Sequence, residues 1–180
     1  MQYRRARTKN GTYFFTLVTM NRHRILTQPE HATLLRNVFK RVMTRHPFTI
    51  EAFVLLPDHI HCIWSLPEAD GDYSKRWRLI KSGFSRQCNV AHKHAANESR
   101  KTKKELAVWQ RRFWEHAIRD DDDFKNHVEY IHYNPVKHGW ANTPGQWEYS
   151  SFHRYVRNGI YKHDWCAGHA PALDDTIGKE

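Results

Sequence analysis

Two histidines separated by one residue, His59 and His61, lie in a run of alternating residue types that is typical of a β-strand. Side chains two positions apart in a strand point to the same face, with Cα atoms roughly 6 to 7 Å apart. Two imidazole nitrogens at that spacing can bind one metal ion. In a chain with 14 histidines the spacing could arise by chance. The other face of the run is apolar, however, and two imidazoles in the middle of a sheet favour a site.

A tyrosine and an asparagine four residues apart, Tyr130 and Asn134, lie in a segment with the apolar periodicity of a helix. That spacing places both on one face, next to the apolar stripe of Val128 and Ile131. A phenol can act as a nucleophile, and an amide oxygen is a hard ligand that suits magnesium or manganese. A lone tyrosine on a helix is more often a packing residue, so the pair gains weight only from its neighbours.

Composition indicates a folded, basic protein. The chain has 180 residues, with 29 Lys plus Arg against 19 Asp plus Glu, and aromatic residues make up 13%. A net charge of +10 favours a polyanionic partner, nucleic acid first, and the aromatic content excludes a disordered basic tail. Three scattered cysteines, the absence of a long apolar stretch and the absence of an apolar leader predict a cytoplasmic protein with no membrane partner.

The elements that must position these residues follow from hydrophobic periodicity. Strands are predicted at about residues 12–19, 50–56, 59–66 and 108–118, and helices at about 29–45, 74–88 and 120–134. Asn134-Pro135 is expected to end the last helix. The order β-α-β-β-α-β-α predicts an α+β protein with a ferredoxin-like split βαβ, in which helices lie mainly on one face of an antiparallel sheet. The helix carrying Tyr130 and a C-terminal extension follow, and the basic segment 91–105 is expected to be a mobile connection.

Three blocks of sequence, read together, resemble a known family. They are residues 55–61 with the two histidines around Ile60, residues 109–119, and residues 130–137 with the tyrosine. In composition, order and separation these blocks resemble the HUH single-tyrosine transposases, and within them the REP-associated tyrosine transposases. The resemblance covers roughly residues 5–165, and it implies one catalytic domain over residues 1–165 followed by a polar tail at 166–180.

The resemblance also implies roles for individual residues. By it, His59 and His61 are metal ligands, Tyr130 is the nucleophile and Asn134 is a third ligand. Tyr133 is the competing nucleophile, although it lies about 300° around the helix from Tyr130 and has no ligand candidate four residues further on.

The function implied is cleavage and joining of single-stranded DNA at REP-type palindromic hairpins. The resemblance implies a 5′-phosphotyrosine intermediate, a requirement for Mg²⁺ or Mn²⁺, and no organic cofactor. We expect a monomer, with a dimer left open. The alternatives are a hairpin DNA-binding module that does not cut and an RNA-binding ferredoxin-like domain. Residues expected to bind DNA phosphates, besides the basic run at 100–104, are Arg4, Arg5, Arg7, Lys75, Arg76 and Arg78.

Overall fold

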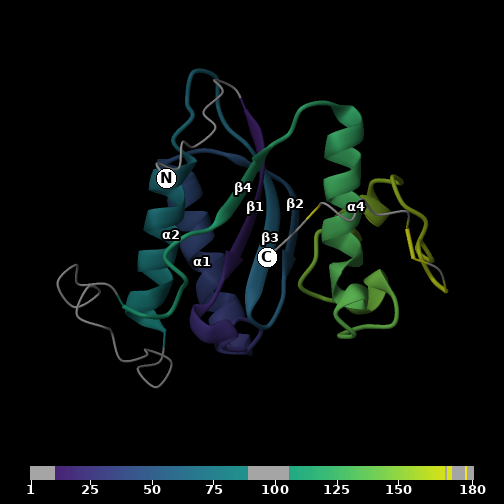
Figure 1. Ribbon diagram of the computed structural model, residues 1–180, viewed down its shortest axis with the longest axis horizontal. Coiled ribbons are helices and arrows are strands. Elements are labelled where there is room, and N and C mark those ends of the chain that lie inside the picture. Colours follow the sequence, from purple (N-terminus) through teal and green to yellow (C-terminus); the bar gives the residue numbers. More distant parts are fainter. Residues whose placement is uncertain (1–10, 89–105, 169, 172–176, 178–180) are drawn as a thin grey trace.

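The computed structural model describes residues 11–88, 106–168, 170, 171 and 177 (Figure 1). A four-stranded antiparallel sheet has the order β2-β3-β1-β4, which confirms the predicted α+β fold with a split βαβ arrangement. Its strands are β1 (Thr12–Val18), β2 (Thr49–Leu55), β3 (His59–Ser65) and β4 (Trp114–Ala117). The helices are α1 (Pro29–Arg45), α2 (Tyr73–Gln87), α4 (Asp121–Lys137) and α5 (Phe152–Arg157), with short 3-10 turns η1 (Met20–Arg22) and η3 (Pro144–Gln146).

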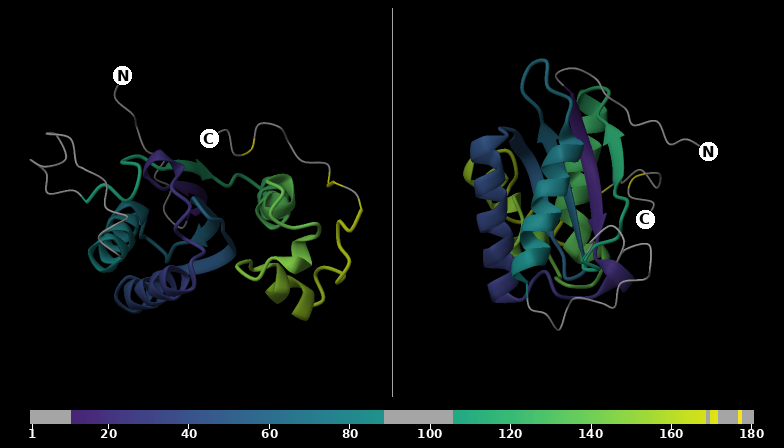
Figure 2. Two further views of the ribbon diagram at one scale, coloured as in Figure 1. Left: turned by 90° about the horizontal axis from the view of Figure 1, so that it is seen from below. Right: turned by 90° about the vertical axis from the view of Figure 1, so that its left-hand side faces the viewer.

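Helices cover the sheet on both faces. Figure 2 shows α1 and α2 on one side of the sheet and α4 on the other. The alternation along β3 agrees with the prediction, because Ile60, Cys62 and Trp64 belong to the core beneath α1 and α2. His59 and His61 point to the opposite face, where the core includes Val128 and Ile131 of α4.

Large aromatic rings fill the core beneath α1 and α2. The rings of Trp64 and Trp77 stack with centroids 3.9 Å apart, and the Phe48 ring lies 4.1 Å from Trp64. The two helices approach closely at Gly83, where an added Cβ would lie only 3.0 Å from a methyl group of Val38. Close packing of these side chains opposes any shift of β3 along its neighbours, so it holds the strand in a single register.

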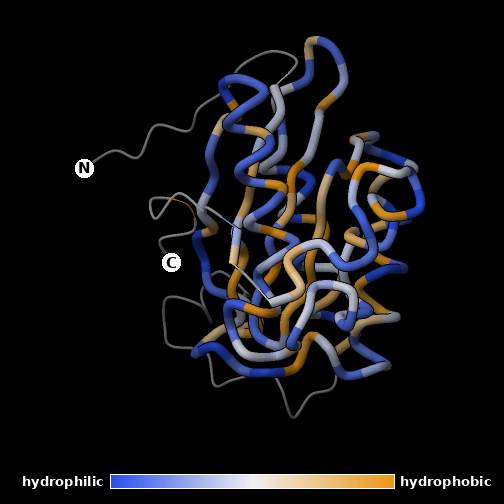
Figure 3. The backbone as a smooth tube through the Cα atoms, turned by 90° about the vertical axis from the view of Figure 1, so that its right-hand side faces the viewer, coloured by the Kyte–Doolittle hydropathy of each residue, from blue (hydrophilic) through white to orange (hydrophobic). Residues whose placement is uncertain are grey.

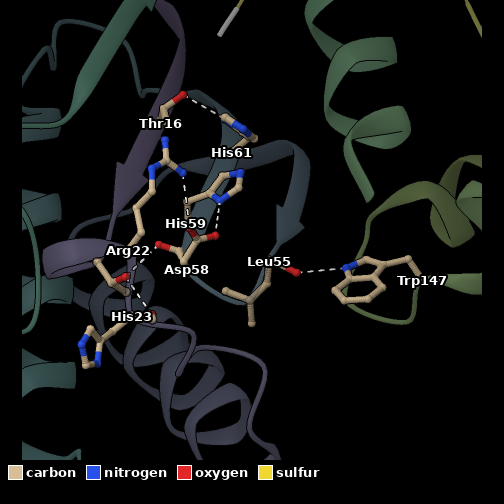
Figure 4. Close-up of polar contacts among 9 residues, drawn as sticks. Thr16, Arg22, His23, Leu55, Asp58, His59, His61 and Trp147 are labelled. Atoms are coloured by element: carbon tan, nitrogen blue, oxygen red, sulfur yellow. Dashed lines mark hydrogen bonds and ion pairs between the residues drawn. The ribbon is translucent and has the colours of Figure 1, made fainter. Parts of the chain in front are cut away.

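The outer edge of β2 is covered by the chain that follows η3. The Leu55 N–H donates to the Tyr149 carbonyl at 2.9 Å, and the Ser151 N–H donates to the Phe53 carbonyl at 2.8 Å. The Trp147 indole N–H also donates to the Leu55 carbonyl, at 3.0 Å (Figure 4). These contacts satisfy backbone groups that an open edge would leave for another strand.

The prediction for the fourth strand was too long. Instead of spanning 108–118, β4 begins at Trp114. Upstream, Trp109 forms a single bridge with Thr19 at the end of β1. The exposed, polar residues that follow leave the sheet, and the Lys81 ammonium on α2 donates to the carbonyls of Gln110 and Arg111. These carbonyls are therefore satisfied by a side chain and not by a continuous ladder.

The predicted end of the last helix was also wrong, because α4 continues through Pro135 to Lys137. Proline lacks the N–H that would bond to the carbonyl four residues back, but its φ angle suits a helix. Helical hydrogen bonding resumes directly afterwards, since the His138 N–H donates to the Asn134 carbonyl at 3.0 Å. The proline therefore lies in the last turn of α4 and does not end it.

The distribution of hydropathy agrees with this layered arrangement. In Figure 3, apolar stretches run through the middle of the molecule, and most of the surrounding loops are hydrophilic. Among the helices in the described part of the chain, none is long and apolar enough to cross a membrane. The basic segment predicted at 91–105 and most of the tail predicted at 166–180 lie outside the described residues.

A buried histidine links α4 to the C-terminal segment. His132 is fully buried, its Nε2 lies 2.7 Å from the Ser151 hydroxyl, and the rings of Phe152 and Tyr155 pack against it. Burial lowers the pKa of His132 to about 3, assisted by the nearby charge of Arg154. His132 therefore stays neutral at physiological pH.

This depressed pKa predicts a loss of stability in mild acid. Between pH 6.5, the ordinary value, and about 3, the unfolded chain binds a proton at His132 that the folded chain does not. The free energy of unfolding should therefore fall as the pH drops below 6.5, by up to about 1.4 kcal/mol per pH unit. Urea unfolding at pH 7.5 and 5.5 measures the change. His132→Gln, which can still bond to Ser151, should show a smaller loss; an equal loss in both proteins would contradict the assignment.

Candidate active site

The two histidines of β3 lie side by side between the sheet and α4. His59 is 1% exposed and His61 is fully buried, and their ring centroids lie 4.8 Å apart. The strand brings them together because both occupy the face opposite the aromatic core. The sequence-based expectation that the two imidazoles are neighbours is confirmed.

Each imidazole is oriented by a hydrogen bond at Nδ1 (Figure 4). His59 Nδ1 lies 2.6 Å from an Asp58 carboxylate oxygen, and His61 Nδ1 lies 2.8 Å from the Thr16 hydroxyl. Thr16 is opposite His61 in the pairing of β1 with β3. With Nδ1 engaged in both rings, Nε2 is the atom that would bind a metal ion, and a partner at the second nitrogen is usual for histidine ligands.

Asp58 is held as a carboxylate. Partial burial would raise its pKa, but the hydrogen bond with His59 and the Arg22 guanidinium, 3.2 Å from the other carboxylate oxygen, hold the pKa below its ordinary value. An ionised carboxylate at Nδ1 orients the ring and leaves Nε2 as the nitrogen for a metal ion.

Helix α4 brings Tyr130 to the same face. The helix begins where the Asp120 side chain accepts a hydrogen bond from the Asp123 N–H at 2.8 Å, with further carboxylates in its first turn. Tyr130 is 2% exposed, and its ring centroid lies 5.2 Å from that of His61. The Lys137 ammonium lies 4.7 Å from the centroid of the same ring. The competing residue, Tyr133, is half-buried and lies three positions further along the helix.

Asn134 lies between two contacts that α4 makes with the histidine pair. One turn earlier Tyr130 contacts His61, and one turn later the His138 ring lies 5.1 Å from that of His59. Asn134 is fully buried, and among the described residues neither its amide oxygen nor its amide nitrogen has a hydrogen-bond partner. Leaving a buried amide unsatisfied costs about 1–3 kcal/mol.

The donor set fits a divalent metal ion. Two buried imidazoles with Nδ1 already engaged, together with a buried amide oxygen in need of a partner, offer the nitrogen and oxygen ligands that manganese and magnesium accept. His59, His61 and Asn134 are therefore the residues of this face that could hold the ion.

A second group of side chains lies one helical turn before Tyr130. Ligand atoms of His116 on β4 and of Asp123 and His127 on α4 lie within 4.8 Å of one another, close enough to hold a metal ion by distance. The two imidazole planes are nearly parallel, at 12°, so their in-plane lone pairs do not converge on one point. Arg119 also donates to Asp123, at 3.1 Å. As arranged, the group is a hydrogen-bonded network that joins α4 to β4.

Electrostatics support this description of the network. Burial would raise the pKa of Asp123, but hydrogen bonds from Arg119 and His116 hold it well below its usual range. Burial lowers the pKa of His127 despite the neighbouring carboxylate. The network thus contains an ionised carboxylate and a neutral imidazole at the start of the helix that carries Tyr130.

The basic residues predicted to bind DNA fall into different environments. Lys75 and Arg78 are exposed on α2, on the side of the sheet away from His59. Arg76 is 3% exposed, and its guanidinium donates to Asp70 at 2.7 Å and to backbone carbonyls. Its charge is neutralised inside the protein, which corrects the expectation that it binds phosphate. The other predicted residues, Arg4, Arg5 and Arg7, lie outside the described residues.

Several residues around the histidines were missed in the sequence. Asp58 directly precedes His59, but an adjacent residue in a strand is expected on the opposite face, and only the turn before β3 brings its carboxylate back. Thr16 could be found only from the strand register. His138 follows Asn134 by four residues. The helical spacing that places Tyr130 and Asn134 on one face could therefore have predicted that His138 lies there too.

Comparison with known proteins gives consistent matches. The family described as "Transposase IS200 like" matches residues 7–134. The chain is 44% identical over 165 residues to a "REP-associated tyrosine transposase" of Escherichia coli (strain K12), covering 92% of this chain and 90% of the relative. It is 44% identical over 163 residues to a "Putative REP-associated tyrosine transposase" of Haemophilus influenzae, covering 91% and 92%.

A solved structure agrees with the sequence comparisons. It is described as "Structure of the REP associates tyrosine transposase bound to a REP hairpin" and is similar to this chain with a TM-score of 0.81 and 40% identity. The similarity covers 100% of this chain and 98% of the solved one, so it includes the sheet, α4 and the C-terminal segment.

The hydrogen bond between Asp58 and His59 yields a prediction on metal affinity. Asp58→Asn should lower the affinity for Mn²⁺ about 10- to 100-fold, because the neutral amide orients the His59 ring less well than the carboxylate does. Isothermal titration calorimetry of the purified protein measures the affinity. Asp121→Asn, which removes an exposed carboxylate from the first turn of α4, is the matched control and should bind Mn²⁺ as the parent does. Equal affinities in all three proteins would argue against metal binding by His59.

Proposed function

This chain belongs to the IS200-like transposase family and, within it, to the REP-associated tyrosine transposases, and on that basis we propose that it cleaves and rejoins single-stranded DNA at REP-type hairpins. Its class is that of a DNA-processing enzyme. The observation that carries the finer proposal is the contact of the Tyr130 ring with His61, 5.2 Å between centroids, beside His59 and on the helix that also carries the buried Asn134.

Tyr130 is the proposed nucleophile. Its phenolic oxygen forms a bond to the scissile phosphorus as the bond from phosphorus to the 3′ oxygen breaks, and the phenolic proton is balanced by the proton that the 3′ hydroxyl gains. The products are a 5′-phosphotyrosine and a free 3′ hydroxyl. Attack by another 3′ hydroxyl on the phosphotyrosine reverses the step and joins two strands, so no ATP or organic cofactor is needed.

Residues around Tyr130 hold its ring in place. The Lys137 ammonium lies over the ring, 4.7 Å from its centroid. The packing of the ring against His61 and Phe14 fixes where the phenol can point.

His59, His61 and Asn134 are the proposed ligands of Mg²⁺ or Mn²⁺. When bound, a divalent ion there polarises the phosphate and stabilises the charge that develops on it. Asp58 and Thr16 orient the two imidazoles. A module that only binds DNA would need neither the buried ligand set nor the nucleophile.

The proposed substrate follows from the similar solved structure, which holds a REP hairpin, and from the net charge of +10. Lys137 and His138 are exposed at the end of α4 beside the histidine pair, so DNA would reach the site from this end. Lys75 and Arg78 on α2 are proposed to contact phosphates elsewhere on the DNA.

The nucleophile can be tested by trapping the covalent intermediate. The protein would be incubated with labelled hairpin DNA carrying an unpaired flank, in Mn²⁺ or Mg²⁺, and run on a denaturing gel. We expect a protein–DNA band with the parent, none with Tyr130→Phe, and an undiminished band with the control Tyr133→Phe. A band that persists in Tyr130→Phe and disappears in Tyr133→Phe would move the nucleophile to Tyr133. Hairpin binding without a band in either metal would favour a DNA-binding module.

Substitution of the proposed ligands should reduce cleavage without reducing DNA binding. His59→Ala and His61→Ala should each slow cleavage by at least about a hundredfold, while hairpin affinity changes little, because the ion acts on the reacting phosphate more than on the rest of the DNA. Cleavage rates and binding titrations on the same hairpin measure the two effects. His163→Ala, at an exposed position outside the site, is the matched control. Parallel losses of binding and cleavage would indicate a structural role for the histidines.

A further inference from the structure

Trp140 stands out among the tryptophans of this protein. All seven tryptophans lie within the described residues, and Trp140 is the most exposed of them, at 37%. Trp64 and Trp77, by comparison, are fully buried. Part of the Trp140 ring surface is therefore open to contact with a partner.

The backbone holds Trp140 in a defined place. At the end of α4, the Trp140 N–H donates to the Pro135 carbonyl at 2.8 Å and the Gly139 N–H to the Val136 carbonyl at 3.0 Å. This pair of bonds is the Schellman motif, and it needs a positive φ at Gly139, which is 70°. Trp140 is therefore anchored directly to the helix that carries Tyr130, and not to a separate loop.

An arginine from another part of the chain lies against the Trp140 ring. The Arg24 guanidinium carbon is 4.9 Å from the ring centroid, and Arg24 is itself exposed. The loop around Arg24 is held to the turn before β3, because the Leu26 N–H donates to the Pro57 carbonyl at 2.9 Å and the Thr19 N–H to the Asp58 carbonyl at 2.8 Å. Arg24 thus has a fixed neighbour in the turn that leads to His59.

The ring and the arginine lie next to the proposed cleavage site. His138, two residues before Trp140, has its ring 5.1 Å from that of His59. The charged neighbours on this surface are mostly positive: Arg22 and Lys137 are exposed, and Asp58, the facing carboxylate, is paired with Arg22. A basic surface with an exposed aromatic ring is the combination that binds single-stranded nucleic acid.

We propose that Trp140 and Arg24, together called the Trp140 platform, stack on one unpaired base of the DNA strand beside the scissile phosphate. The inference rests on the proposed function and adds a base-binding subsite to it. Arg24 lies against one face of the indole, so the base would stack on the other face. Stacking needs no particular hydrogen-bond pattern, so the platform positions the strand and accepts any base.

Binding can be measured without cleavage in a Tyr130→Phe background. Each nucleotide of the unpaired flank of a hairpin DNA would be replaced singly by an abasic site, and affinity measured by fluorescence anisotropy. We expect one flank position to lose about tenfold in affinity, as for the loss of one stacked base. In Tyr130→Phe with Trp140→Ala the intact DNA should bind about tenfold more weakly, and the abasic site at that position should cause no further loss.

Variants of the platform supply the controls. Trp140→Phe should restore both the affinity and the sensitivity to the abasic site, since phenylalanine also stacks, and Arg24→Gln should weaken binding in part. Ile160→Ala, which shortens a side chain that is 60% exposed outside the platform, should bind as the parent does. A blunt hairpin without a flank should bind equally well with and without the Trp140→Ala substitution. This comparison distinguishes a contact with an unpaired base from a contact with the stem.

Four results would overturn the proposal: no effect of Trp140→Ala on the flanked hairpin, abasic penalties that persist in that variant, an equal loss on the blunt hairpin, or no hairpin binding at all. The outcome is separable from that of the proposed function, because the covalent band depends on Tyr130 and can form whether or not Trp140 contributes to affinity.

Discussion

The hydrogen bonds at Nδ1 of His59 and His61 connect the chemistry of this protein to the register of its sheet. A buried polar atom without a partner costs about 1–3 kcal/mol, so a partner at Nδ1 lowers the cost of holding each imidazole in a strand that is buried on both faces. Thr16 meets this need through the pairing of β1 with β3, and Asp58 meets it from the preceding turn. A shift of β3 by one residue would turn both histidines into the aromatic core and remove the site altogether.

The second face of the sheet needs a cover, and α4 supplies both that cover and the proposed nucleophile. Val128 and Ile131 bury apolar surface of the helix on the sheet, and this packing fixes the helix axis relative to β3. The helical repeat then places Tyr130, Asn134 and His138 one turn apart along the histidine pair. The residues that pack on the sheet and the residues proposed for the chemistry therefore lie on neighbouring stripes of one helix. The packing that stabilises the fold also positions the tyrosine.

Much of this arrangement could be predicted from short-range patterns. The alternation of β3 separates the histidines from Ile60 and Cys62, and the helical spacing pairs Tyr130 with Asn134; both periods are local properties of the chain. The bounds of α1 were predicted correctly for the same reason, whereas β4 was predicted too long. Upstream of β4 the Lys81 side chain of α2 binds the Gln110 carbonyl, and local periodicity contains no information on such a contact.

The contacts around the site that were missed depend on distant segments meeting. Thr16 and His61 are 45 residues apart, and the partner of Trp140 is Arg24, from the opposite end of the chain. Arg76 is a second example of a property that the sequence did not predict. Its place among the basic residues of α2 is typical of a surface cation, but its guanidinium is buried against Asp70. Charge and spacing predict which residue types are available, but burial and partners decide what each one can bind.

The turn before β3 joins the proposed metal site to the proposed base-binding surface. Asp58 contacts His59 with one carboxylate oxygen and Arg22 with the other, and its carbonyl accepts the Thr19 N–H from the loop that carries Arg24. Trp140 is fixed to α4 by two backbone bonds, and α4 is packed on β3. Hydrogen bonds and packing thus connect both parts of the platform to the strand that carries the histidines. A base held by Trp140 would therefore place its neighbouring phosphate at a constant distance from Tyr130, and it is by such fixed placement of reacting groups that a site lowers the entropic part of an activation barrier.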